Sequence, residues 1–130
     1  FDPRSDDYNT ESLLLVEDQA ALRQSMVELL TTWNYHVLEA TNGRHALDIL
    51  DSTPEPIALV LTDAVMPVMG GIGLLKEIRQ RGLDIPVVLV TGHPLQDELE
   101  GLRRLGMTAW LAKPVSVVQL ANTLALALKS

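Results

Sequence analysis

The feature that most constrains the fold is a set of short, wholly apolar runs that recur along the chain. Leu13–Val16, Ile57–Leu61 and Val87–Val90 contain no polar side chain, which is typical of strands buried on both faces of a parallel sheet. Two further segments, His36–Glu39 and Ala109–Ala112, are predicted to be strands as well. The chain therefore predicts five strands.

Segments with helical signals separate these strands. Apolar residues recur at the spacing of an amphipathic helix from about Gln19 to Trp33. The other helices are expected to follow turn or capping signals, namely Asn42-Gly43, Gly70-Gly71, Pro94 and a capping box of Ser116 and Gln119. Five strands that alternate with five helices predict a three-layer, doubly wound α/β fold.

The last helix is more apolar than a solvated helix needs to be. Its core face is expected to hold Val117, Leu120, Ala121, Leu124 and Leu128, which leaves Val118, Ala125 and Leu126 on other faces. Exposed apolar groups of this kind often mark an interaction site. We expect the surface formed by the fourth helix, the fifth strand and the last helix to contact another protein or a second copy.

The domain boundaries follow from the same pattern. Residues 1–11 are polar, acidic and turn-prone, so we predict a disordered lead or interdomain linker there. Residues 12–130 are predicted to form one domain. Because the chain begins at Phe1 rather than at Met, we interpret it as a piece of a longer protein.

Charge and composition exclude several classes of function. The net charge is −7 and the ten Lys and Arg residues are scattered, so direct nucleic-acid binding is not expected. The chain has no cysteine, which excludes disulfides and thiolate metal sites. No apolar run approaches the roughly 20 residues needed to cross a bilayer, so we expect no membrane insertion and a cytoplasmic location.

Polar residues follow four of the predicted strands at the point where each one ends. Glu17 and Asp18 follow the first strand, Asp63 the third, Thr91 the fourth and Lys113 the fifth. In an open parallel sheet these carboxyl ends line one crevice, where ligands bind. We therefore expect the five side chains to share one site.

These residue types suit the transfer of a phosphoryl group. Three carboxylates repel one another unless a cation lies between them, and Mg²⁺ prefers oxygen ligands. Lys113 adds a positive charge and Thr91 a hydroxyl donor, so that metal, ammonium and hydroxyl can hold the oxygens of the group. One carboxylate can then act as a nucleophile and become an aspartyl phosphate.

Each residue alone also has an ordinary structural role. Asp18 can cap the first helix, and Asp63 can form a turn before Met66-Pro67. Thr91 can be a capping hydroxyl and Lys113 a surface lysine. Their joint placement at four strand ends favours the functional interpretation.

Other chemistries find less support. His36, His45 and His93 show no metal-ligand spacing and are interpreted as surface or loop residues. No Ser/His/Asp arrangement is evident, which disfavours triad hydrolysis. No phosphate-binding glycine loop follows the first strand, which disfavours a nucleotide-binding domain.

At these residues the sequence resembles the receiver domains of two-component response regulators. The similarity runs from about Ser12 to Leu128 and rests on LLLVEDQ at 13–19, LVLTDAVMPVMGG at 59–71, VVLVTGH at 87–93 and WLAKPV at 110–115. The resemblance implies a flavodoxin-like receiver fold, in which a parallel sheet of order 2-1-3-4-5 is flanked by five helices.

The resemblance also implies a role for each site residue. Asp63 would accept phosphate from a histidine kinase or a histidine phosphotransfer protein, and the domain would catalyse its own phosphorylation and dephosphorylation there. Mg²⁺ would be bound by Asp18 and Asp63, by Glu17 through water, and by the backbone carbonyl of Val65. Lys113 would contact the phosphate, Thr91 would move toward it, and a cis peptide before Pro114 would orient the lysine.

The sequence departs from the usual family pattern at three positions. Trp110 stands where the family more often has the Tyr or Phe that turns inward when Thr91 moves, and we predict that the larger indole stays outward. Val65 stands where many members have a polar side chain that influences phosphate lifetime. Glu17 replaces a more common Asp and keeps the charge.

The parent protein is expected to be a hybrid sensor histidine kinase that carries this receiver. A stand-alone single-domain regulator is the next alternative. A degenerate pseudo-receiver that only binds partners is disfavoured, because every residue of the acceptor site is present.

Overall fold

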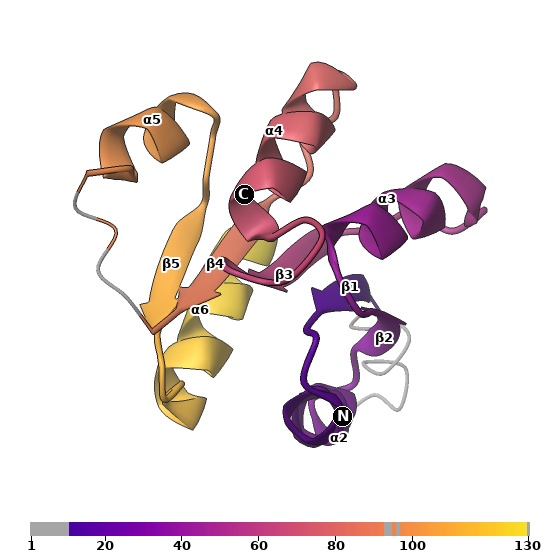
Figure 1. Ribbon diagram of the computed structural model, residues 1–130. Helices are drawn as coiled ribbons and strands as arrows, with labels where there is room; N and C mark the ends of the chain where they lie inside the picture. Colours follow the sequence, from indigo (N-terminus) through magenta and orange to yellow (C-terminus); the bar gives the residue numbers. More distant parts are fainter. Residues whose placement is uncertain (1–10, 93–94, 96, 130) are drawn as a thin grey trace.

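The computed structural model describes residues 11–92, 95 and 97–129 of the chain. Residues 1–10 of the predicted lead, His93 and the predicted helix start at Pro94 therefore lie outside the described residues. Within the described part, strands and helices alternate along the chain (Figure 1). In order they are β1 (Ser12–Val16), α2 (Ala20–Thr32), β2 (His36–Ala40), α3 (Gly43–Ser52), β3 (Leu59–Asp63), α4 (Gly71–Gln80), β4 (Val87–Thr91), α5 (Leu99–Arg104), β5 (Ala109–Ala112) and α6 (Val117–Lys129).

The strands form one parallel sheet of order β2-β1-β3-β4-β5. Val16 at the end of β1 lies opposite Ala40 of β2 and Thr62 of β3, and Asp63 lies opposite Val90 of β4. This order confirms the predicted doubly wound α/β fold. Because the strand order reverses between β1 and β3, the carboxyl ends of these two strands border the crevice in which such folds bind ligands.

Helices cover both faces of the sheet (Figure 1). α2 and α6 lie on one face, where Met26 and Leu120 pack in a cluster with Leu15 of β1. α3, α4 and α5 cover the other face, where Leu74 packs in a cluster with Leu14. Successive side chains of a strand point to opposite faces, so the unbroken apolar runs fill both cores.

β3 starts and ends two residues later than predicted. Its ladder with β1 begins at the pair Leu13 and Leu59, and the Ala58 amide just before it donates to the Ser12 carbonyl at 2.8 Å. The strand thus includes Thr62 and Asp63, which are both buried. The sequence pattern counted only apolar residues and therefore ended the strand before these two.

α6 buries most of the predicted face, with Ala127 added and Val117 left out. Leu120, Leu124 and Ala127 are buried, whereas Val117 is 54% exposed. Val117 is the first residue of the helix and lines a groove beside Lys113 instead of packing on the strands. The remaining predicted core residues Ala121 and Leu128 are half-buried, and Val118, Ala125 and Leu126 are exposed as predicted.

Side-chain caps fix the start of two helices. The Asn42 side chain accepts a hydrogen bond from the His45 amide at 2.9 Å, and the Ser116 hydroxyl accepts one from the Gln119 amide at 3.3 Å. The second bond is one half of the predicted capping box. In the described part of the chain no helix combines the length and the apolar character needed to cross a membrane.

Candidate functional site

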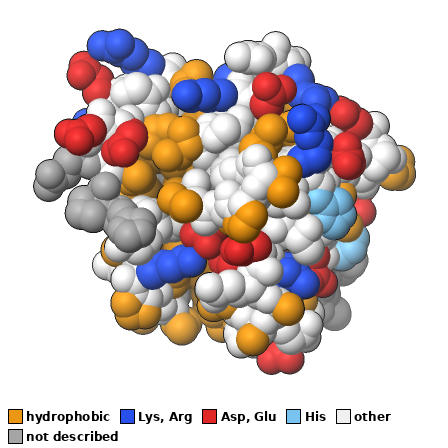
Figure 2. Space-filling model, viewed as in Figure 1, with side chains coloured by type: hydrophobic (Ala, Val, Ile, Leu, Met, Phe, Trp, Pro, Cys, Tyr) orange, Lys and Arg blue, Asp and Glu red, His pale blue; other side chains and the backbone are white. Residues whose placement is uncertain are grey.

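The carboxyl edge of the sheet brings the predicted site residues together. Asp63 ends β3 and Thr91 ends β4, while Glu17 and Asp18 follow β1 and Lys113 follows β5. Carboxylate oxygens of the three acidic residues lie within 4.8 Å of one another. Figure 2 shows acidic side chains gathered near the middle of this face, with Lys or Arg side chains to either side. The strand ends therefore form one shared site, as the sequence predicts.

Asp63 is held rigidly at this edge. Its side chain is only 8% exposed, and its Oδ2 accepts a hydrogen bond from Lys113 Nζ at 2.8 Å. The carbonyl of Asp63 accepts from the Thr62 hydroxyl at 3.0 Å, and the next amide, of Ala64, donates to the Val90 carbonyl at 2.8 Å. These bonds fix the positions of the Asp63 carboxylate and of the backbone on either side of it.

Two glycines allow the loop after β3 to pass close to Asp63. A Cβ at Gly71 would lie 2.4 Å from the Asp63 carbonyl oxygen, and a Cβ at Gly70 would lie 2.5 Å from the Ala64 carbonyl oxygen. The Gly71 amide also donates to the Ala64 carbonyl at 3.0 Å. The sequence predicted these glycines only as a lead into a helix and missed their closeness to Asp63.

Glu17 is buried next to Asp63. Its side chain is 4% exposed, and its Oε2 accepts a hydrogen bond from the Gln19 amide at 3.0 Å. Burial raises the pKa of the Glu17 carboxyl above its usual value; the bond from Gln19 lowers it, and the negative charge of Asp63 raises it further. The fold therefore holds a carboxylate whose charge needs a cation nearby.

Asp18 does not cap the first helix, which was its ordinary structural interpretation. The N-cap position of α2 is Gln19, without a side-chain cap, and the carboxylate that accepts from the Gln19 amide belongs to Glu17. Asp18 is exposed and lies beside Glu17 and Asp63. Its carboxylate is therefore available to a ligand from solvent.

The donor set fits a hard divalent cation. Three carboxylates within 4.8 Å of one another supply oxygen ligands alone, and Mg²⁺ prefers one or two carboxylates together with waters and a phosphate. The described residues contain no sulfur or imidazole in this cluster that would favour a softer metal. The backbone carbonyl of Val65 as a further ligand stays a prediction.

Lys113 is the cation of the site. Its Nζ lies 2.8 Å from Asp63 Oδ2 and 3.9 Å from Glu17 Oε1. Burial lowers the pKa of the ammonium, but the hydrogen bond and the charge of Asp63, together with Glu17, outweigh it and raise the pKa overall. The Lys113–Pro114 peptide is cis, and the Lys113 amide donates to the Thr91 carbonyl at 2.9 Å. Lys113 thus links the ends of β4 and β5 to Asp63.

Trp110, His36 and His45 lie away from this cluster. Trp110 is 38% exposed on β5 and lines a surface hollow with Gln119, Asn122 and Thr123 of α6, among others. His36 is exposed and pairs with Glu55 at 2.9 Å, and the exposed His45 accepts from the Thr41 amide at 3.1 Å. The surface interpretation of His36 and His45 is confirmed.

One charged residue close to the site was missed. Arg23 of α2 donates through Nη1 to the carbonyl of Glu17 at 2.8 Å and through Nε to Glu39 of β2 at 3.2 Å. The only sequence signal for a role of Arg23 at the site was its position four residues after Gln19, near the start of the predicted helix. Nothing in the sequence shows that its side chain reaches back to the end of the strand.

Comparison with known proteins agrees with this geometry. Residues 13–125 match the response regulator receiver domain family. The chain is a member of that family. A sensor kinase CckA of Brucella abortus is 37% identical over 86% of this chain, and a sensor histidine kinase RcsC of Salmonella typhi is 36% identical over 95% of it. The receiver spans only 12% and 13% of these two relatives.

Solved structures lead to the same family. A receiver domain protein from Clostridium thermocellum has a TM-score of 0.84 and 27% identity, with 92% of this chain and 94% of that chain covered. The chemotaxis response regulator CheY4 of Vibrio cholerae has a TM-score of 0.80 and 28% identity, with 91% and 98% covered. This chain is therefore a receiver domain of two-component signalling, homologous to the receivers of hybrid kinases.

Proposed function

We propose that this receiver takes a phosphoryl group from a phosphohistidine onto Asp63, with Mg²⁺ as cofactor, and thereby switches its partners. The observation that carries the proposal is the contact at 2.8 Å between the Asp63 carboxylate and Lys113 Nζ, in a cluster with Glu17 and Asp18. Three carboxylates and an ammonium thus meet at one edge of the sheet, which supports a site for phosphoryl transfer.

The chemistry is a displacement at phosphorus. An oxygen of Asp63 forms the new P–O bond while the P–N bond to the donor imidazole breaks, and the imidazole nitrogen keeps the electron pair. The Lys113 ammonium and the Thr91 hydroxyl stabilise the negative charge on the transferred group. Asp18, Asp63 and the Val65 carbonyl would hold Mg²⁺ directly and Glu17 would hold it through water, and the ion would supply further charge neutralisation. Hydrolysis of the aspartyl phosphate by water resets the switch.

A groove beside the acceptor suits the phosphodonor. It has a volume of about 550 Å³ and is lined by residues of α2 and α6 together with Asp63 and Lys113. Its walls are mostly apolar and include Leu22 and Met26 of α2 and Val117 of α6. An amphipathic helix of a histidine kinase or phosphotransfer protein that packs there brings its phosphohistidine to Asp63.

The output surface is proposed to lie on α5, β5 and α6. Val118, Asn122 and Leu126 follow one another at helical spacing on α6, and the two apolar members are 69% and 70% exposed. Trp110 of β5 shares a hollow with Asn122. We expect this surface to bind a partner protein or a second copy, with Trp110 outward in both states.

The parent protein is proposed to be a hybrid sensor histidine kinase. Two observations support this. The two similar proteins above are named as sensor kinases, and each is far longer than the receiver. A stand-alone regulator would carry out the same chemistry. A pseudo-receiver would not, and the complete acceptor site argues against it. The cytoplasmic location stays a prediction.

The proposal is tested with phosphoimidazole, the smallest donor with the chemistry of phosphohistidine. Wild-type protein should gain one phosphoryl group in Mg²⁺ and none in excess chelator, as read by intact mass. Asp63→Asn should gain none. Asp84→Asn is the matched control, because Asp84 is exposed and precedes β4 at the opposite edge of the sheet. Equal labelling of wild type and Asp63→Asn would refute the proposal.

A further inference from the structure

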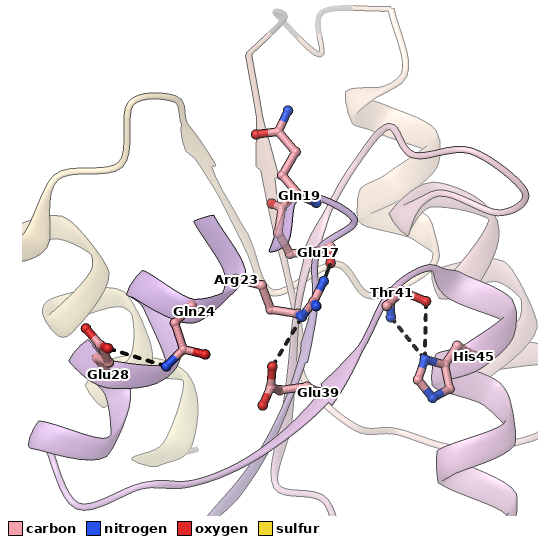
Figure 3. A network of polar contacts seen from close by, with 8 residues as sticks. All are labelled: Glu17, Gln19, Arg23, Gln24, Glu28, Glu39, Thr41 and His45. Carbon is pink, nitrogen blue, oxygen red and sulfur yellow. Dashed lines mark hydrogen bonds and ion pairs between the residues drawn. The ribbon is translucent and has the colours of Figure 1, made fainter. Parts of the chain in front are cut away.

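Arg23 makes two polar contacts that reach the acidic end of β1 from the side of α2. Figure 3 shows its guanidinium between Glu17 and Glu39. Nη1 donates to the backbone carbonyl of Glu17 at 2.8 Å, and Nε donates to Oε1 of Glu39 at 3.2 Å. The Arg23 side chain is 18% exposed; its contact with the Glu17 carbonyl is partly buried, and its contact with Glu39 is open to solvent.

The carbonyl of Glu17 lies just beyond the strand ladder. The last residue pairs of β1 are Val16 with Ala40 and Val16 with Thr62, and the Glu17 amide still donates to the Ala40 carbonyl at 3.0 Å. The Glu17 carbonyl accepts a hydrogen bond from Arg23. Arg23 thereby fixes the peptide plane that joins Glu17 to Asp18.

That peptide joins two acidic residues of the cluster, and the Arg23 bond restrains the backbone between them. The Glu17 carboxylate is already held by the Gln19 amide at 3.0 Å, whereas Asp18 is exposed. A change of ψ at Glu17 that φ at Asp18 does not compensate would move the Asp18 carboxylate relative to Asp63. The observed cluster has all three carboxylates within 4.8 Å of one another, and a restrained backbone at residues 17 and 18 favours that arrangement.

We propose that Arg23 is a positioning residue for the cation site and that it sets the affinity for Mg²⁺ without touching the ion. Groups that orient metal ligands from behind commonly change metal affinity by about 10- to 100-fold when removed. The inference rests on the proposed function, because it takes the carboxylate cluster to be the Mg²⁺ site.

Glu39 completes the arrangement. It lies on β2 opposite Leu15 of β1, and its carboxylate holds the Nε side of the guanidinium while Nη1 is aimed at Glu17. A planar guanidinium can serve both acceptors at fixed angles, whereas an ammonium is a single point donor. Arg23→Lys therefore keeps the charge and loses the geometry.

The test measures Mg²⁺ binding directly, by titration of backbone amide chemical shifts at residues 17–19 and 63–65. Arg23→Met should weaken Mg²⁺ binding about tenfold, and Arg23→Lys should weaken it more than threefold. The matched control is Arg79→Met. Arg79 also donates to backbone carbonyls, those of Leu83, Leu105 and Gly106, but it lies at the far end of α4. This control should lose stability and keep the wild-type dissociation constant.

The outcomes separate the inference from the proposed function. If wild-type protein shows no Mg²⁺-dependent shifts at these amides, the metal site itself is wrong. If wild type binds Mg²⁺ and both Arg23 variants bind it within threefold of wild type, the positioning role of Arg23 is overturned and the rest stands. If Arg23→Met does not fold, the threefold limit on the change in Mg²⁺ affinity is applied to Arg23→Lys alone. Equal weakening in Arg79→Met would also overturn the inference, because it would mark a general loss of stability.

Discussion

Gly71→Ala should destabilise the receiver and slow its phosphorylation, although alanine is the better helix former. Gly71 is the first residue of α4, and a Cβ there would lie 2.4 Å from the carbonyl oxygen of Asp63 and 2.9 Å from side-chain atoms of Leu89 and Thr62. Ordinary contact begins at 3.4 Å. The loop and the end of β3 must therefore separate by nearly 1 Å, at the acceptor itself.

The net effect follows from two opposing terms. Replacing glycine by alanine inside a helix gains at most about 1 kcal/mol, while forcing atoms into a packed site costs about 1–3 kcal/mol and sometimes more. Here the opposing atom is backbone on a central strand, which cannot rotate away, so the cost should reach the upper end. We expect a net loss of about 2 kcal/mol, or a fall in Tm of roughly 8 °C for a domain of this size.

Gly73→Ala is the matched control within the same helix. Its Cβ would meet only Cγ of the flexible Met69 side chain, at 3.3 Å, so the helix propensity should dominate and stability should rise by about 0.5–1 kcal/mol. Urea denaturation gives both values, and phosphorylation by phosphoimidazole gives the functional effect. If Gly71→Ala is as stable as Gly73→Ala and is phosphorylated at the wild-type rate, the account of the crowded loop is wrong.

Three further predictions address single residues. Val68 has a φ of 72° and is 82% exposed, so Val68→Asn should stabilise the domain by about 1 kcal/mol in urea denaturation, whereas Val118→Asn should not. The pKa of Glu17 is raised from 4.5. The ionised form of Glu17 therefore lowers the stability of the fold. Without Mg²⁺, Glu17→Gln should have a higher Tm than wild type at about pH 8. This difference in Tm should shrink as the pH falls toward 4.5. A pH-independent gap would contradict this. In a Trp33→Phe background, beryllofluoride should leave the Trp110 emission nearly unchanged, and a large blue shift would show that the indole turns inward.

The fold and the site residues were accessible from the sequence because both depend on short-range patterns. Apolar runs such as Val87–Val90 identify buried strands without knowledge of their neighbours, and a polar residue at the end of each run is then at the carboxyl edge by topology alone. Asp63 and Lys113 are 50 residues apart in sequence and 2.8 Å apart in space. The parallel arrangement of β3 and β5 explains why their proximity could be predicted.

The features that escaped prediction depend on distances between segments. The reach of Arg23 back to the Glu17 carbonyl and the crowding at Gly71 both require the exact spacing of a helix and a strand end. Val117 has the helical spacing of a core residue, but its position at the very start of α6 leaves it exposed beside Lys113. The spacing of apolar residues alone does not show which of them, at the end of a helix, stay exposed.

The most direct test of the central claim is identification of the phosphorylated residue. An aspartyl phosphate is reduced by borohydride to homoserine, which changes the mass of the peptide that carries it. After phosphorylation in Mg²⁺ and reduction, we predict that residue 63 alone is converted, and that neither omission of Mg²⁺ nor the Asp63→Asn variant gives any conversion. Conversion at Asp18 or at another carboxylate with Asp63 intact would contradict the assignment of the phosphoryl acceptor.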